Sequence, residues 1–179
     1  DCQIIITDAD HRGLLDGLEL SGVRVLQTGT PEWDQLVSTA GELEPLTVPT
    51  AMDTYMLIFT SGTSGNPKPV QLPHMLPPFS GGMLADKYQI GSDDVCYVSM
   101  PLFHSAALVA GFAVGVAGGA AIVPARFSAT TFLSDIRHFG ATYMNYVGKP
   151  LAYVLATPEQ PDDADNPLRV AFGNEATDR

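Results

Sequence analysis

The sequence predicts an α/β protein with a largely parallel sheet and flanking helices. Two observations support this fold class. Short apolar runs, typical of buried strands, alternate along the chain with segments that carry helical spacing or helix-start signals. Turns marked by Gly and Pro separate these segments. Strands that alternate with helices favour parallel pairing, because each helix returns the chain to the edge where the previous strand began.

The leading part of the chain predicts two strands, at residues 4–6 and 23–26. Asp8 or Asp10 is expected to cap a short helix between them. Residues 41–50, which contain Gly and Pro, are expected to form a connector rather than a helix or strand.

A strand at residues 55–59 and a return strand at residues 70–72 are predicted after the connector. A helix is expected to start at the proline pair that begins with Pro77 and to run towards Tyr88, because proline is tolerated in a first helical turn. Another strand is predicted at residues 95–99.

Residues 106–125 contain no charged side chain and are long enough to be considered as a membrane span. In that case Gly111 and Gly115 would mark a helix interface in the membrane. Further glycines and a closing proline interrupt the segment, so we favour a buried helix at residues 105–117, a Gly-Gly turn and a strand at 120–123.

The last third of the chain predicts an amphipathic helix that begins at Ser128 and stops at Gly140. Its apolar side chains recur at helical spacing: Ala129, Phe132, Leu133, Ile136 and Phe139. The remaining expected elements are a strand, a helix and a last strand that ends before Gly173, at residues 142–146, 150–155 and 168–172.

Composition limits the partners of the protein. The chain has 179 residues and an apolar fraction of 45%, which is enough for a buried core. Its net charge of −11 argues against a nucleic-acid surface and against adhesion to anionic lipid headgroups. It does not exclude ATP, because a local cradle can hold phosphates within an acidic protein.

A loop from Thr60 to Lys68 carries the strongest functional signal. It contains four hydroxyls, two glycines and one lysine, but no acidic residue. Glycines let backbone N–H groups approach an anion, hydroxyls donate hydrogen bonds, and lysine adds a positive charge. A plain surface turn is the alternative. The predicted ligands of the ATP phosphates are Thr60, Ser61, Gly62, Thr63, Ser64, Gly65 and Lys68.

The spacing of Gly62 and Gly65, with Pro69 after the lysine, does not fit a Walker P-loop. The loop instead resembles, from Thr60 to Lys68, the phosphate loop of adenylate-forming enzymes. That superfamily includes acyl-CoA synthetases, the adenylation domains of nonribosomal peptide synthesis and luciferases. Pro69 departs from the family, which usually has glycine there, so a stiffer loop exit is expected.

A second segment, Pro-Leu-Phe-His-Ser, ends at Ser105. It resembles a segment of the same superfamily in which a histidine lies near the carboxylate substrate and the reacting phosphate. A lone histidine beside apolar residues is often structural, but the resemblance implies a catalytic role for His104. A histidine can donate a hydrogen bond to a carboxylate or a developing charge. His104 and Lys68 are therefore the predicted catalytic residues.

Residues 127–148 resemble fatty-acid–CoA ligases, especially the branch with very-long-chain acyl-CoA synthetases and fatty-acid transport proteins. Lys149 departs from this branch, which often has glutamate there. The resemblance implies an acyl pocket that includes Tyr146, Val147 and Gly148, and an adenine site at Gly173, Asn174 and Glu175.

The implied activity joins a fatty acid to coenzyme A (CoA). The carboxylate attacks the α-phosphorus of ATP, pyrophosphate leaves, and CoA takes the acyl group from the adenylate. Mg²⁺ would be held largely by ATP and by residues outside this chain, so no metal ligand is assigned here. Two different functions remain open: an acyl-AMP ligase or amino-acid adenylation domain that loads a carrier protein, and a non-catalytic nucleotide-binding module.

The resemblance covers residues 1–179 as one partial N-terminal AMP-binding domain, with leading elements in 1–50 and the phosphate loop and core in 51–179. The C-terminal domain is expected to be absent, so the chain alone is expected to be inactive and to self-associate through exposed edges. Fatty acid, ATP and CoA are the expected partners. A cytoplasmic protein without a membrane span is expected, with peripheral membrane contact left open.

Overall fold

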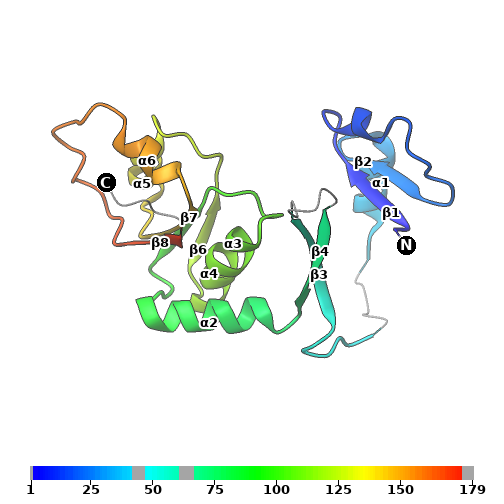
Figure 1. Cartoon of the computed structure of the whole chain (residues 1–179), viewed down its shortest axis with the longest axis horizontal. Helices are drawn as coiled ribbons and strands as arrows, with labels where there is room; N and C mark the ends of the chain where they lie inside the picture. The colour runs from blue at the N-terminus through cyan, green and yellow to red at the C-terminus, as the bar shows by residue number, and fades with distance from the viewer. Residues whose placement is uncertain (1, 42–46, 61–66, 175–179) are drawn as a thin grey trace. The chain divides into compact units, whose positions relative to one another are not determined.

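The computed structural model describes residues 2–41, 47–60 and 67–174 (Figure 1). Contacts within the chain divide it into two units, residues 1–48 and residues 49–179. The second unit contains the larger sheet and the segments that resemble the acyl-CoA synthetases.

The first unit is built on a pair of parallel strands, β1 (Ile4–Thr7) and β2 (Arg24–Gln27). Both expected strands are confirmed: β1 extends one residue beyond its predicted end, and β2 is shifted by one residue towards the carboxyl terminus. The expected helix between them is only a single 3₁₀ turn, η1 (Arg12–Leu15). Asp8 accepts a hydrogen bond from the His11 N–H at 2.8 Å, so it stabilises the turn that leads into η1.

A helix that the sequence analysis missed, α1 (Pro31–Thr39), follows β2. The Thr30 hydroxyl oxygen accepts a hydrogen bond from the Trp33 N–H at 3.3 Å and caps the helix. Glu32 and Asp34 place negative charge in the first turn, where the helix dipole favours it. These start signals are present in the sequence and would have located the helix.

The second unit begins with an antiparallel hairpin of β3 (Thr54–Thr60) and β4 (Lys68–Pro73), which confirms the predicted strand and its return. The main sheet has the order β6-β5-β7-β8, and every pairing in it is parallel. The predicted α/β class with a largely parallel sheet is confirmed. These four strands are β5 (Val95–Val98), β6 (Ala121–Pro124), β7 (Tyr143–Val147) and β8 (Val170–Asn174).

Helices cover both faces of this sheet (Figure 1). One face packs against α2 (Leu76–Tyr88) and against a continuous helical segment that has three parts. These parts are α3 (Ser105–Ala107), a π-turn called η2 (Leu108–Phe112) and α4 (Ala113–Gly118). The other face packs against α5 (Phe132–Phe139) and α6 (Pro150–Leu155).

The core follows directly from the alternation of side chains along the central strands. Cys96 and Tyr143 point to the face covered by α2 and α4, whereas Tyr97 and Met144 point to the face covered by α5 and α6. All four side chains are fully buried. Burial raises the pKa of Tyr97 to about 12, and its hydroxyl donates a hydrogen bond to Asp135 at 3.0 Å.

The apolar segment considered as a membrane span forms the helical segment α3, η2 and α4, which packs on the sheet with one side, and then strand β6. Gly111 and Gly115 face the sheet: a Cβ atom at these positions would lie 2.5 Å from Asn145 Oδ1 and 2.5 Å from Ile122 Cγ1. The two glycines therefore permit close packing of the helix on the strands. Among the residues that the structure describes, no helix has the length and apolarity needed to cross a membrane.

Several predicted boundaries were wrong by a residue or more. The amphipathic helix begins at Phe132 and not at Ser128; the hydroxyls of Ser128 and Thr130 hydrogen-bond to each other at 3.1 Å in the preceding turn. The last strand begins at Val170 and not at residue 168, and it does not end before Gly173: β8 runs to Asn174 and pairs with β7 along its whole length.

A buried carboxylate joins the strands at the amino-terminal edge of the sheet. Both Asp94 carboxylate oxygens accept hydrogen bonds from Arg169 Nη2, at 2.8 and 2.9 Å. Thr142, next to β7, donates to Asp94 at 2.6 Å, and the Gly91 N–H donates at 2.9 Å. Arg169 also donates to the carbonyls of Tyr88 and Gln89 at the end of α2, where positive charge suits the helix dipole.

These contacts determine the ionisation of Asp94. Burial alone would raise the pKa of its carboxyl, but the hydrogen bonds from Thr142, Gly91 and Arg169 outweigh burial and hold the pKa below its usual value. A lowered pKa in the folded state means that the carboxylate stabilises the fold at neutral pH. This contribution is lost as pH falls below the unfolded-state pKa, about 3.9, and through the lower folded-state value.

Replacement Asp94→Asn should lower the free energy of unfolding by about 2 kcal/mol at pH 7, because an amide cannot accept all of these hydrogen bonds. The difference from the unsubstituted chain should shrink as pH falls below about 4. Urea denaturation at a series of pH values measures both effects.

Asp93→Asn is the matched control, because Asp93 is the neighbouring residue and its side chain is exposed. It should change the free energy of unfolding by less than about 0.5 kcal/mol. A loss for Asp94→Asn that is equally large at pH 3 and at pH 7 would contradict the role assigned to the carboxylate.

Candidate functional site

Some of the predicted site residues lie at the carboxyl-terminal edge of the main sheet, where ligands usually bind in open α/β folds. A cavity of about 280 Å³ lies there. It is lined by the ends of β7 and β8 and by the start of the helical segment that follows β5. Its lining includes Tyr146, Val147, Gly173, Asn174, Ser105 and Ala106.

The wall formed by β7 and β8 depends on a glycine. Tyr146 pairs with Gly173 and Val147 pairs with Asn174 in the parallel ladder. A Cβ atom at position 173 would overlap the Tyr146 carbonyl oxygen and would lie 2.6 Å from Cδ1 of the Tyr146 ring. Because glycine has no side chain, Gly173 leaves room for the Tyr146 ring beside β8.

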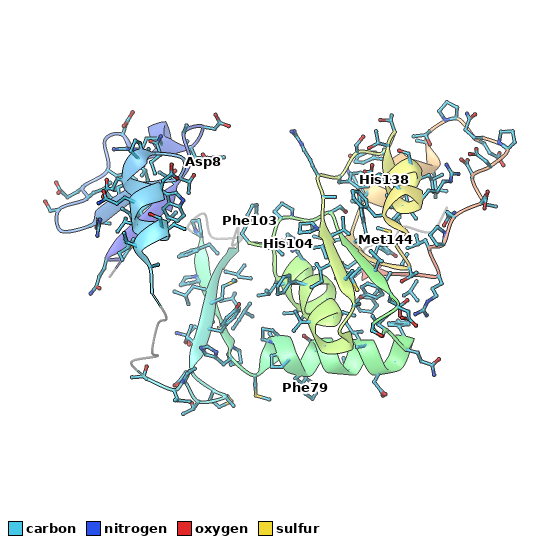
Figure 2. The ribbon with its side chains drawn as sticks, turned by 180° about the vertical axis from the view of Figure 1, so that it is seen from behind. Asp8, Phe79, Phe103, His104, His138 and Met144 are labelled. Atoms are coloured by element: carbon cyan, nitrogen blue, oxygen red, sulfur yellow. The ribbon has the colours of Figure 1, made fainter. Side chains whose placement is uncertain are left out.

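His104 lies at the N-cap of α3, in the turn between β5 and the cavity-lining residues Ser105 and Ala106. Its imidazole Nδ1 accepts a hydrogen bond from the Ala106 N–H at 3.4 Å, and the side chain is exposed. Phe103 beside it is 76% exposed. Figure 2 labels both side chains at the turn that enters the helical segment. His104 is thus free to meet a ligand.

The ends of the predicted phosphate loop are fixed by the β3–β4 hairpin. Thr60 and Lys68 are paired across the ladder, and Lys68 is exposed. Pro69, the departure from the family pattern, pairs with Phe59 inside the hairpin, where its fixed φ suits an extended strand. The intervening ligands and one adenine residue lie outside the described residues: Ser61, Gly62, Thr63, Ser64, Gly65 and Glu175.

The structure therefore brings together four of the predicted residues in one cavity: Tyr146, Val147, Gly173 and Asn174. Gly148 follows β7 with a positive φ of 67° and donates its N–H to the Asn174 carbonyl at 2.9 Å, but it does not line the cavity. Thr60 and Lys68 lie on the hairpin, and Lys68 does not line the cavity.

Sequence reasoning missed Asn145, which lines the same cavity and is only 1% exposed. Its side-chain Nδ2 donates to the Ala106 carbonyl at 3.1 Å. The signal was a polar amide within the otherwise apolar or aromatic run that became β7. A buried amide of this kind needs a hydrogen-bond partner, which makes it informative about its surroundings.

The π-turn next to the cavity is held by side chains from other elements. A π-turn breaks the regular helical hydrogen-bond pattern, so partners from outside the helix can reach its carbonyls. The Tyr143 hydroxyl donates to the Ala110 carbonyl at 2.6 Å, and the Ser80 hydroxyl lies 3.0 Å from the Val109 carbonyl oxygen. Together with Asn145 on Ala106, these contacts fix the helical wall of the site.

Within residues 2–41, 47–60 and 67–174, no group of three or more His, Cys, Asp or Glu side chains is arranged to hold a metal ion.

Relatives of known function cover almost the whole chain. It is 49% identical over 177 residues to the medium/long-chain-fatty-acid–CoA ligase FadD17 of Mycobacterium marinum, a match that covers 98% of this chain and 34% of the relative. It is 44% identical to a steroid-22-oyl-CoA synthetase of Rhodococcus jostii, over 99% of this chain and 33% of the relative. The chain thus spans about a third of the length of these relatives.

Solved structures share the fold. The N-terminal domain of FACL13 from Mycobacterium tuberculosis matches 97% of this chain and 45% of that chain, with a TM-score of 0.79 and 20% identity. The AMP complex of O-succinylbenzoate coenzyme A synthetase from Bacillus subtilis matches 96% of this chain and 34% of that chain, with a TM-score of 0.69 and 26% identity.

The model of one protein family matches residues 1–179, the whole length of the sequence. The chain has a parallel sheet and relatives among the acyl-CoA synthetases, and this family model covers all of it; the chain therefore belongs to the AMP-binding enzyme family.

Proposed function

We propose that this chain forms part of the active site of a fatty-acid–CoA ligase. The observation that carries the proposal is the single cavity that holds the residues expected to contact the acyl group, Tyr146 and Val147, and those expected to contact adenine, Gly173 and Asn174. An adenylating enzyme needs its carboxylate and its nucleotide side by side, because they react with each other. The FadD17 relatives support a fatty acid as the carboxylate.

In the proposed reaction, a carboxylate oxygen attacks the α-phosphorus of ATP, and pyrophosphate leaves with the electron pair of the broken P–O bond. The CoA sulfur then attacks the acyl carbon and AMP leaves. Most of the acceleration in the first step comes from positioning and from stabilising charge. His104 would donate a hydrogen bond near the carboxylate, and the loop from Thr60 to Lys68 would hold the phosphates. Mg²⁺ would enter with ATP.

A second carboxylate class is favoured by a specific relative. The steroid-22-oyl-CoA synthetase is 44% identical over nearly the whole chain. A steroid side-chain acid is therefore a second candidate substrate for the same cavity. The acceptor could also be a carrier protein in place of CoA, as in an acyl-AMP ligase or an amino-acid adenylation domain. A non-catalytic nucleotide-binding module is the candidate function of a different class.

Fatty-acid transport proteins among the relatives, such as the rat long-chain fatty acid transport protein 2 at 40% identity over 118 residues, give a reason to propose peripheral contact with membranes. A fatty-acid substrate partitions into lipid, so an enzyme that contacts the membrane surface would have access to it there. Binding of the full-length protein to vesicles would distinguish this proposal from a purely cytoplasmic location.

Exchange of pyrophosphate into ATP tests the proposed function. A full-length protein that carries this chain should catalyse exchange that depends on an added carboxylate, with medium- or long-chain fatty acids preferred over steroid side-chain acids and amino acids. His104→Ala should lower the exchange rate by about 100-fold, because a donor to the developing charge is lost. Full exchange activity in that variant would remove His104 from the proposed mechanism. Absence of exchange with every carboxylate, despite measurable ATP binding, would favour the non-catalytic module.

The variant Lys68→Ala combined with Thr63→Ala should weaken ATP binding at least tenfold, because it removes a charge and a hydroxyl donor from the proposed cradle. Isothermal titration of the full-length protein with ATP measures the change. Lys87→Ala is the matched control, because Lys87 is exposed in the last turn of α2. Equal ATP affinity in the double variant and in the control would show that the loop is not a phosphate cradle.

We also propose that this chain self-associates. Tyr55, Leu57 and Phe59 on β3 are exposed, and Phe79 on the outer side of α2 is 62% exposed (Figure 2). Apolar side chains next to strand edges favour pairing between copies. Light scattering over a concentration series should show a mass that rises above that of the monomer.

Leu57→Ser with Phe59→Ser should reduce this association, because both exposed side chains lie on β3. A constant monomer mass for the unsubstituted chain at high concentration would contradict the proposal.

A further inference from the structure

Asn145 is buried at the cavity wall, and only the Nδ2 end of its side-chain amide has hydrogen-bond partners among the described residues. The Nδ2 group donates to the Ala106 carbonyl at 3.1 Å and lies 3.5 Å from the Met100 sulfur. The Oδ1 atom is buried and has no hydrogen-bond partner among the described residues. A buried acceptor without a partner lowers the stability of the fold. We therefore expect the contribution of Asn145 to lie at the other end of its amide, the Nδ2 donor.

The amide orientation is determined by its neighbours. If the two ends of the amide were exchanged, Oδ1 would face the Ala106 carbonyl oxygen, and two acceptors would repel each other. On the other side, the backbone of Gly111 lies so close that a Cβ atom there would be 2.5 Å from Oδ1. Asn145 is therefore held between Gly111 and Ala106 with its donor on Ala106.

Ala106 connects Asn145 to His104. Its carbonyl accepts from Asn145, and its N–H donates to His104 Nδ1 at 3.4 Å. The second hydrogen bond is long, so it persists only if the backbone around Ala106 is kept in place. A neutral imidazole that accepts at Nδ1 carries its proton on Nε2.

We propose that Asn145 is a positioning residue that acts through Ala106 to keep His104 in the neutral tautomer with its proton on Nε2. The donor of Asn145 and the acceptor of His104 meet the two polar backbone groups of one residue, Ala106. The two groups belong to adjacent peptide units that meet at the Ala106 Cα, so a hydrogen bond that fixes the carbonyl limits how far the N–H can move.

The chemical consequence rests on the proposed function. The carboxylate and the phosphates of the proposed reaction carry acceptors only, so a ring nitrogen that meets them must donate. With Nδ1 occupied by the Ala106 N–H, His104 presents its Nε2–H outward. The other neutral tautomer would leave Nε2 as an acceptor, which would repel an anionic substrate.

The ¹⁵N chemical shifts of histidine ring nitrogens distinguish the two tautomers and test the proposal directly. The whole chain, labelled with ¹⁵N at its four histidines, is the sample, and His104→Gln identifies the His104 signals. In the unsubstituted chain we expect a proton on Nε2 and none on Nδ1. Asn145→Asp keeps the size of the side chain and removes the donor, so it should produce a mixture of tautomers.

A second variant keeps the test decisive if Asn145→Asp does not fold. Ala106→Pro removes the N–H that His104 accepts from, at the second position of a helix, where Pro77 already stands in α2. This variant, too, should produce a mixture of the two His104 tautomers. Met100→Leu is the matched control, because it removes the other neighbour of Nδ2 and leaves Ala106 untouched.

The proposal fails if His104 carries its proton on Nδ1 in the unsubstituted chain, or if its shifts are unchanged in a folded Asn145→Asp or Ala106→Pro variant. It also fails if Met100→Leu shifts the tautomer as strongly as these two variants.

Pyrophosphate exchange by the full-length protein separates this proposal from the proposed function. Asn145→Asp should lower kcat about tenfold and change KM for ATP little, because the histidine donor acts in the reaction and not in nucleotide binding. If the tautomer shifts but kcat does not, the positioning role of Asn145 stands and the catalytic role of His104 is wrong.

Discussion

The contact between Asp94 and Arg169 is the constraint on which the arrangement of the main sheet depends. It joins the start of β5 to the residue before β8, and Thr142 adds the residue before β7. Arg169 reaches further to the end of α2. A single buried carboxylate thus links the starts of three short parallel strands and the end of one helix at their common edge, in addition to the hydrogen bonds of their ladders.

The polar contacts of Asp94 and Arg169 lie at the amino-terminal edge of the main sheet, and the candidate site lies at its carboxyl-terminal edge. There the strand ends carry side chains that line a cavity. The hydroxyls of Ser80 and Tyr143 hold the π-turn next to it, and the amide of Asn145 holds Ala106 in α3. The fold therefore separates the residues that secure it from those that would meet a ligand. Substitutions at the amino-terminal edge are expected to change mainly the free energy of unfolding, and substitutions at the carboxyl-terminal edge mainly ligand binding or activity.

The sequence was sufficient to predict most of the fold, and four of the residues that it proposed for the site lie together in one cavity. Apolar runs and proline positions located the strands and α2, because they act over a few residues. The start of α5 could not be predicted from apolar spacing, since the hydroxyls of Ser128 and Thr130 favour a local turn over the helix. The need for glycine at position 173 could not be predicted either, because it arises from the Tyr146 ring on a neighbouring strand. Asn145 depends on Ala106, which lies 39 residues away.

The π-turn gives the helical segment after His104 a fixed phase. A π-turn holds one residue more than the corresponding α-helical turn, so the extra residue is taken up within one wide turn. Loss of one residue within Leu108–Phe112 would let the helix close regularly, and the carbonyls that meet Tyr143 and Ser80 would return to the ordinary helical hydrogen-bond pattern. Substitutions in this turn change side chains one at a time, but a deletion would remove the contacts that hold this wall of the cavity. The length of this short segment is thus as much a part of the site as the identity of its residues.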